Sequence, residues 1–170
     1  MLQSHIFIAG PSGSGKSTLA KTLAMLTGCR YLSLDNYWKG GPGLFVNAPL
    51  GGIVRSYEDP SLYDGAQLAA NVAAHGAPCV AEGFCLLSYP EIQAVAGHRF
   101  YMEVPFDVCM DRRLARRPQR PSDASFWLIG EQETNRWVLP QKALPGVTIL
   151  DATASPQEIL SHLAPTPLNR

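Results

Sequence analysis

The chain has 170 residues, with 14 lysines and arginines against 14 aspartates and glutamates, so its formal charge is zero. This length suits one domain with a substantial core, and the balanced charge gives no reason to expect nucleic acid or an anionic membrane as a partner. The four cysteines form no C-x-x-C pair and the sequence shows no leader or membrane-length apolar stretch, so we expect free thiols and a cytoplasmic protein.

Apolar runs of strand length alternate along the chain with segments that have a helical pattern. The predicted strands are residues 5–9, 30–34, 78–81, 99–104 and 147–150, and the predicted helices are residues 15–26, 64–74, 107–117, 124–138 and 156–163. This alternation predicts a single α/β domain over residues 1–170, in which a five-stranded parallel sheet is covered by helices on both faces.

Two segments carry no clear pattern. Residues 39–60 are rich in glycine and proline, and residues 117–123 have proline at positions 118 and 121. Long loops inside a compact domain are usually functional. We therefore expect residues 39–60 to wall a substrate pocket, and residues 117–123 to hinge a small helical lid of about residues 117–125.

The stretch GPSGSGKS lies between the first predicted strand and the first predicted helix. Gly10, Gly15, Lys16 and Ser17 fit the pattern G-x-x-x-x-G-K-S/T of the phosphate-binding loop (P-loop). Glycines let backbone N–H groups surround phosphate oxygens, the lysine reaches the β- and γ-phosphates, and the serine hydroxyl coordinates magnesium. The motif predicts a three-layer αβα P-loop NTPase fold that binds ATP and Mg²⁺. The predicted nucleotide-binding residues here are Gly10, Ser12, Gly13, Ser14, Gly15, Lys16, Ser17 and Thr18.

Two acidic residues follow predicted strands. Asp35, in YLSLDNYW, would lie at the sheet edge where α/β proteins bind ligands, and could act as a general base or contribute to the metal site; the alternative is an aspartate that begins a turn with Asn36. Glu82, in PCVAEGF, could hold the magnesium ion with Ser17. Its alternative is a carboxylate that faces solvent.

A basic run, DRRLARRPQR, covers the end of the helix predicted over residues 107–117. Such a run is often a solvated face. After a P-loop, guanidinium groups can also neutralise charge on the transferring phosphoryl group. We expect Arg112 and Arg116 to serve catalysis and Arg113 to bind the nucleotide.

Six blocks resemble, in order, the uridine kinase and nicotinamide riboside kinase group of P-loop kinases. They are GPSGSGKS, LDNYWK, YEDPSLYD, VAEGF, DRRLARR and NRWVLPQKALPGVTIL, and the resemblance runs from about residue 5 to residue 151. It implies that Asp35 is the general base, and that aromatic residues after it line a nucleoside site.

The same resemblance implies two alternatives for the acid that binds the sugar. YEDPSLYD is similar to the F-D-x-P-x-A-F-D motif of uridine kinases, which gives the role to Glu58. Its end is also similar to the Tyr-Asp pair of nicotinamide riboside kinases, which gives the role to Tyr63 and Asp64. Tyr37, Trp38, Tyr57, Phe126 and Trp127 are expected to offer flat faces to a planar base.

These features predict an ATP-dependent kinase that phosphorylates the 5'-hydroxyl of a nucleoside, as uridine and cytidine kinases do. The alternatives are a kinase of nicotinamide riboside or of another small alcohol, such as pantothenate, a sugar phosphate or glycerate, and a regulatory ATP-binding module without transfer. The sequence has neither N-K-x-D nor D-x-x-G after the P-loop, which argues against a GTPase. We expect a small nucleoside-like partner, with homo-oligomerisation open.

Overall fold

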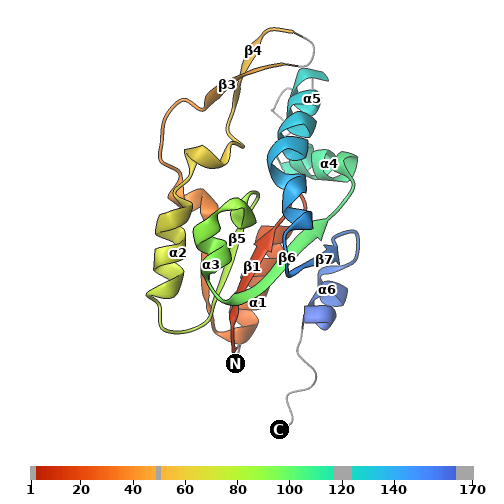
Figure 1. The fold of residues 1–170 in the computed structure, drawn as a ribbon. Helices are drawn as coiled ribbons and strands as arrows, with labels where there is room; N and C mark the ends of the chain where they lie inside the picture. The colour runs from red at the N-terminus through yellow and green to blue at the C-terminus, as the bar shows by residue number, and fades with distance from the viewer. Residues whose placement is uncertain (1–2, 49–50, 117–123, 164–170) are drawn as a thin grey trace.

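A computed structural model, which describes residues 3–48, 51–116 and 124–163, contains a five-stranded parallel sheet between helices (Figure 1). The strand order is β2-β5-β1-β6-β7. The strands are β1 (His5–Ala9), β2 (Arg30–Ser33), β5 (Cys79–Gly83), β6 (Gly97–Glu103) and β7 (Val147–Asp151). Each corresponds to one predicted apolar run, with ends that differ by no more than a residue or two. The predicted α/β fold is confirmed.

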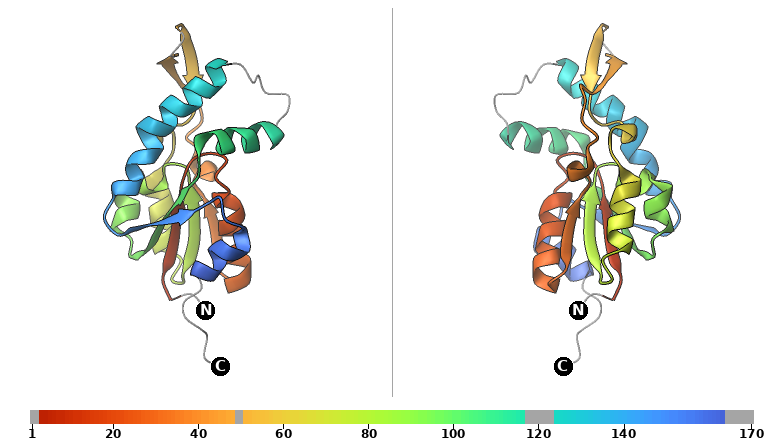
Figure 2. Two further views of the ribbon diagram at one scale, coloured as in Figure 1. Left: turned by 90° about the vertical axis from the view of Figure 1, so that its right-hand side faces the viewer. Right: turned by 90° about the vertical axis from the view of Figure 1, so that its left-hand side faces the viewer.

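The central strand β1 separates two hydrophobic layers. Its side chains alternate between the faces of the sheet, as those of any strand do: Ile6 and Ile8 belong to one core cluster, and Phe7 belongs to the other. Helices α1 and α6 cover the first face, while α2 and α3 cover the second (Figure 2). After His5 the strand is apolar, because both of its faces are buried.

The helices largely follow the predicted pattern. They are α1 (Lys16–Thr27), α2 (Gly65–Ala73), α3 (Pro90–Ala94), α4 (Phe106–Arg116), α5 (Ala124–Glu133) and α6 (Pro156–Leu163), with short turns η1 (Leu34–Tyr37), η2 (Pro60–Leu62) and η3 (Leu86–Ser88). Where one helix was predicted over residues 124–138, α5 ends at Glu133 and a π-helix, η4 (Thr134–Val138), and a 3-10 helix, η5 (Leu139–Ala143), continue the chain. Pro140 lies at the start of η5, and because it has no N–H and clashes with the carbonyl four residues earlier, an α-helix could not continue through this position.

Residues 39–60, which carried no clear pattern, include an antiparallel hairpin of β3 (Leu44–Asn47) and β4 (Ile53–Ser56). It projects beyond the sheet, next to α5 (Figure 1). Glycine and proline around the two strands hide the alternation that normally identifies a hairpin. Residues 117–123, the predicted lid hinge, lie outside the described residues.

None of the helices in the described ranges combines the length and the apolarity needed to cross a membrane.

Helix α4 rests on the P-loop at Gly13. This residue has φ of +100°, and a Cβ atom placed on it would lie 2.4 Å from the carbonyl oxygen of Cys109 in α4. Any side chain at this position therefore forces α4 and the loop apart.

We predict that Gly13→Ala lowers the free energy of unfolding by about 3 kcal/mol or more, from backbone strain together with overpacking. The matched control is Gly28→Ala, because Gly28 also has positive φ (+68°) but nothing lies within 4 Å of the point where a methyl group would be added. The control should cost only about 1–2 kcal/mol for the left-handed conformation. Urea unfolding followed by circular dichroism measures both; equal losses would mean that the contact with α4 contributes nothing.

Candidate active site

The amino terminus of α1 is open toward the P-loop. Its cap is Gly15, no side chain caps its first N–H groups, and no acidic residue lies in its first turn. Most helices satisfy these groups with Ser, Thr, Asp or Asn at the cap. Unsatisfied N–H groups and the positive end of the helix dipole form an anion site, so this terminus is suited to a phosphate.

Glu82 lies inside β5 with its carboxylate held by two hydroxyls. Ser17 Oγ donates to Glu82 Oε2 at 3.0 Å, and the Tyr31 hydroxyl donates to Glu82 Oε1 at 2.8 Å. Only 2% of Glu82 is exposed, which excludes the alternative of a solvent-facing carboxylate. The hydrogen bonds join the first turn of α1 to β2 and β5.

Asp35 lies in η1, directly after β2, beside Glu82. The approach is close because Gly83 has no side chain: a Cβ there would lie 2.5 Å from the Cβ of Leu34. Asp35 is exposed at the cavity; partial desolvation there, followed by the negative charge of Glu82, raises its pKa, while the positive charge of Lys16 lowers it. The carboxylate is therefore a better proton acceptor than a solvated aspartate.

The oxygen atoms at this point fit Mg²⁺, the ion that the P-loop motif implies. Ser17, Glu82 and Asp35 offer one hydroxyl and two carboxylates, which are hard ligands. The described residues hold no cluster of three or more His, Cys, Asp or Glu side chains that could bind a metal. Such a sparse set is what Mg²⁺ commonly uses, since it keeps water and substrate phosphate oxygens as its other ligands.

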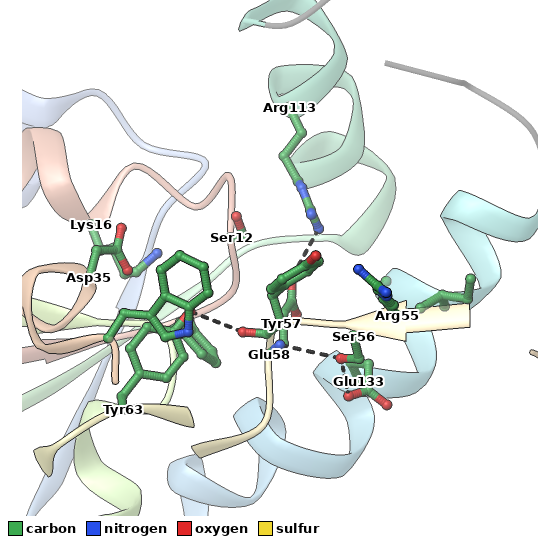
Figure 3. Close-up of a pocket in the computed structure, with 14 residues that line it drawn as sticks. Ser12, Lys16, Asp35, Arg55, Ser56, Tyr57, Glu58, Tyr63, Arg113 and Glu133 are labelled. Atoms are coloured by element: carbon green, nitrogen blue, oxygen red, sulfur yellow. Dashed lines mark hydrogen bonds and ion pairs between the residues drawn. The ribbon is translucent and has the colours of Figure 1, made fainter. Parts of the chain in front are cut away.

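A cavity of about 690 Å³ extends from the P-loop to the hairpin (Figure 3). Figure 3 shows Lys16 and Asp35 at one end, Arg55, Ser56 and Glu133 at the other, and Tyr57 and Glu58 between them. Residues from the P-loop, η1, β4, α4 and α5 line it: Ser12, Lys16, Asp35, Trp38, Arg55, Ser56, Tyr57, Glu58, Tyr63, Phe84, Arg113, Ile129, Gly130 and Glu133. The segment expected to wall a pocket therefore does line one.

Backbone pairing places two of the aromatic rings in this cavity. Trp38 and Tyr63 form an isolated antiparallel bridge, and the N–H of Asp64 donates to the carbonyl of Tyr37 at 2.8 Å. Tyr63 packs edge-on against Phe84, and Trp38 packs edge-on against Tyr57. Aromatic side chains thus line one part of the cavity, next to the polar side chains of Lys16, Asp35 and Glu58.

Glu58 is the acid of YEDPSLYD that lines the cavity. Its Oε1 lies 3.4 Å from Arg113 Nη1, and 17% of its side chain is exposed. Burial raises the pKa of Glu58, the nearby Arg113 and Lys16 lower it, and Glu133 raises it. Asp64 instead caps α2, where its Oδ1 accepts from the N–H of Gln67 at 2.9 Å.

The side chains of the three described arginines in the basic run have different surroundings. Arg113 lines the cavity. Arg112 donates, at 3.4 Å in each case, to the carbonyl oxygens of Ser14 in the P-loop and Ala152 after β7, and Arg116 donates to the carbonyl of Arg112. The predicted catalytic roles of Arg112 and Arg116 remain predictions, whereas the arginine at the cavity is the one expected to bind nucleotide.

Of the predicted aromatic residues, Tyr37 is not part of the cavity lining. Its hydroxyl accepts a hydrogen bond from Asn71 in α2, and its ring packs on the core. Phe126 and Trp127 belong to α5, but their side chains lie outside the described residues. Thr18, in the first turn of α1, is exposed and is absent from the cavity lining.

Sequence reasoning missed several residues of the far wall. Arg55 and Ser56 belong to the hairpin that was not predicted, and Glu133 is the last residue of α5. No motif marks any of them. The one available signal was the expectation that residues 39–60 wall the pocket, which pointed to Arg55 and Ser56 only as a segment.

Comparisons with known proteins identify the family and the fold of the chain. The model of the family described as AAA domain matches residues 6–136. Nicotinamide riboside kinase 1 of Rattus norvegicus is a distant homologue, 26% identical over 186 residues that cover 93% of this chain and 90% of that protein.

Solved structures share the fold. A shikimate kinase from Bacteroides thetaiotaomicron has a TM-score of 0.65 at 16% identity, covering 94% of this chain and 96% of that one. A gluconokinase from Sinorhizobium meliloti 1021 has a TM-score of 0.58 at 18% identity, covering 93% and 87%. At these identities the likeness concerns the fold alone.

The two charges beside Asp35 should move its pKa in opposite directions. We predict that Glu82→Gln lowers the pKa of Asp35 and that Lys16→Met raises it, since the first removes a repelling charge and the second an attracting one. Carbon-13 NMR titration of the magnesium-free protein measures this, with the spectrum of Asp35→Asn for assignment. Glu91→Gln, an exposed acid on α3, should change nothing; shifts of the same sign in both variants would contradict the prediction.

Proposed function

Because the chain belongs to the AAA-domain family, whose P-loop fold it has, we propose that it is an ATP-dependent small-molecule kinase acting on a hydroxyl of a nucleoside-like acceptor. The observation that carries this proposal is that Lys16, Asp35 and Glu58 line one cavity. A phosphate site, a base and an acid for the acceptor thus share one space. A module that only bound ATP would require neither the base nor the acid.

In this reaction the triphosphate lies on the P-loop. The open N–H groups of α1 and the Lys16 ammonium bind its phosphates. Ser17 and Glu82 would hold Mg²⁺, which would supply positive charge to the phosphates. Asp35 accepts the proton of the acceptor hydroxyl. The hydroxyl oxygen bonds to the γ-phosphorus as the bond from phosphorus to the β,γ-bridging oxygen breaks, and ADP leaves. Positioning and charge stabilisation supply most of the catalysis.

The far part of the cavity suits an acceptor that has both a planar ring and hydroxyl groups. Trp38 is 46% exposed and Tyr57 is 44% exposed, which leaves two flat faces available for stacking. Glu58 accepts hydrogen bonds from hydroxyls, and Arg113 donates them. A riboside combines the two features, and Glu58 rather than Asp64 is then the acid that binds its sugar diol.

Among ribosides, nicotinamide riboside is our first choice of acceptor, followed by uridine and cytidine. The distant homologue named for nicotinamide riboside supports this order, as does the mixture of acidic and aromatic side chains that would accept a cationic ring. A second candidate is an acceptor with a carboxylate. Arg55 favours it, since this exposed side chain lines the cavity and packs over the ring of Phe45 at 5.2 Å.

We expect ADP production from ATP only when a riboside is added. A coupled assay would test nicotinamide riboside, uridine and cytidine against gluconate and shikimate, two alcohols with carboxylates, with Lys16→Ala as the inactive control. Turnover with gluconate or shikimate but with none of the ribosides would support the second candidate, an acceptor with a carboxylate. ATP binding without turnover on any alcohol would contradict the kinase proposal.

Asp35→Asn should lower kcat by about 10²- to 10⁴-fold, the usual contribution of a general base, with little change in the Kd for Mg-ATP measured by calorimetry. In the wild-type protein, kcat/KM should fall with decreasing pH, because Asp35 must be ionised and kcat/KM reports the pKa of the free protein. Since its pKa is raised, this fall should begin at a higher pH than it would for a solvated aspartate. A normal kcat in Asp35→Asn would remove Asp35 from the role of base.

A further inference from the structure

Glu133 is a buried acid that the proposed mechanism does not use. Only 1% of it is exposed, and its Oε1 is buried without a hydrogen-bond partner in the described structure. An unsatisfied buried carboxylate oxygen costs free energy. Stability therefore does not explain a glutamate at this position, and its neighbours indicate another role.

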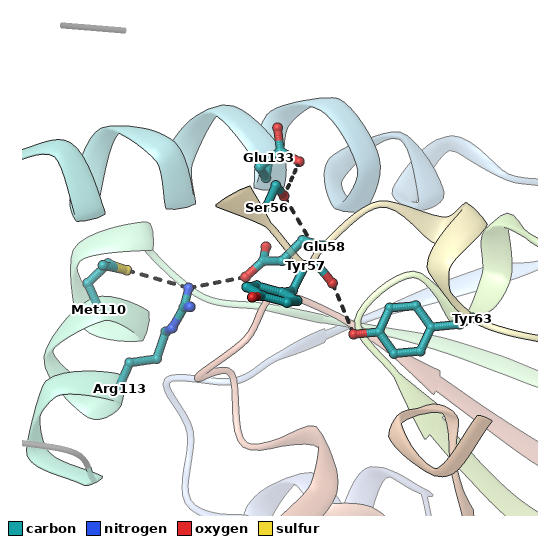
Figure 4. A network of polar contacts seen from close by, with 7 residues as sticks. All are labelled: Ser56, Tyr57, Glu58, Tyr63, Met110, Arg113 and Glu133. Carbon is teal, nitrogen blue, oxygen red and sulfur yellow. Dashed lines mark hydrogen bonds and ion pairs between the residues drawn. The ribbon is translucent and has the colours of Figure 1, made fainter. Parts of the chain in front are cut away.

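A chain of two hydrogen bonds leads from Glu133 to Glu58 (Figure 4). Ser56 Oγ donates to Glu133 Oε2 at 2.7 Å, and the backbone N–H of Glu58 donates to the same Ser56 Oγ at 3.3 Å. A serine hydroxyl has one proton. Because Ser56 Oγ gives that proton to Glu133, its lone pairs are left to accept from the N–H of Glu58.

Two other contacts hold the same turn. The Tyr63 hydroxyl donates to the carbonyl of Tyr57 at 3.0 Å, and Arg113 on α4 forms an ion pair with Glu58. Figure 4 shows that these contacts reach the turn from different elements, with Glu133 approaching from α5. Residues 56–58 would otherwise be the end of a projecting hairpin. Their position depends on these contacts because the five-stranded sheet does not include them.

We propose that Glu133 is a positioning residue, which acts through Ser56 to hold Glu58 in place for the hydroxyl groups of the acceptor. This inference rests on the proposed function, since Glu58 binds the acceptor there. Glu133 lines the same cavity but is only 1% exposed, so we assign its effect to the hydrogen bond with Ser56 rather than to the acceptor itself. Its effect should thus appear in acceptor binding and should leave ATP binding unchanged.

The first test is steady-state kinetics with the accepted riboside. Ser56→Ala should raise the KM for the acceptor by about 10- to 100-fold, the range for a lost hydrogen bond to a charged group, with kcat within about 3-fold and the KM for ATP unchanged. Glu133→Gln should have a smaller effect, because its amide oxygen still accepts from Ser56. Glu131→Gln, an exposed acid on the same helix, is the matched control and should behave as wild type.

The double variant decides whether Glu133 acts through Ser56. If it does, Ser56→Ala with Glu133→Gln should raise KM no further than Ser56→Ala alone, because the route is already broken. If the fold-increases in KM of the two single variants multiply in the double variant, the proposal is overturned. An unchanged KM in Ser56→Ala would also overturn it. With a riboside that lacks the sugar hydroxyl bound by Glu58, all variants should match the wild-type protein; a persistent difference would indicate a general structural defect.

A second measurement needs neither acceptor nor activity. Hydrogen exchange followed by NMR should show that the amide of Glu58 exchanges at least about 10-fold faster in Ser56→Ala than in wild type, if this hydrogen bond protects it. Exchange in β1 should remain unchanged, as a control for global stability. Unchanged exchange at Glu58 would overturn the proposal even if the protein is an active kinase, and faster exchange in a protein without turnover would reject only the proposed function.

Discussion

The site depends on the buried carboxylate of Glu82. A charge inside a sheet is costly unless it is hydrogen-bonded, and here the hydroxyls of Ser17 and Tyr31 provide the two bonds. The strand order makes this possible, because β5 lies between β2 and β1. The same bonds place Ser17 where the P-loop needs a magnesium ligand, so that the interaction which satisfies the buried acid also assembles the phosphate end of the cavity.

The acceptor end is built differently. Its residues come from a hairpin, a turn and two helices, and the sheet fixes none of them. Side-chain contacts do this instead: Arg113 holds the carboxylate of Glu58, Tyr63 holds the backbone before it, and Ser56 with Glu133 holds its N–H. Such contacts are individually worth about 1–3 kcal/mol, so the position of Glu58, the acid proposed to bind the acceptor, depends on several weak interactions.

The degree to which each end was predictable follows from this difference. The phosphate end was predicted residue by residue from contiguous motifs, and the structure places Lys16, Ser17, Asp35 and Glu82 next to one another. At the acceptor end, the sequence left Glu58 and Asp64 as alternatives, because both belong to YEDPSLYD. The structure gives them different positions, since Asp64 caps the amino terminus of α2 and Glu58 lines the cavity; the choice of Glu58 as the sugar acid stays a proposal.

The sequence by itself determined the five parallel strands and the P-loop, since apolar periodicity and the GPSGSGKS spacing are local properties of the chain. The tertiary structure alone decided which side chains from distant parts of the sequence come into contact. Ser56 and Glu133 are 77 residues apart and share a hydrogen bond. Arg113 lines the cavity while Arg112 and Arg116 do not, and nothing in the sequence of the basic run distinguishes these three arginines in that respect. Such pairings depend on how a hairpin and two helices pack, which no local pattern encodes.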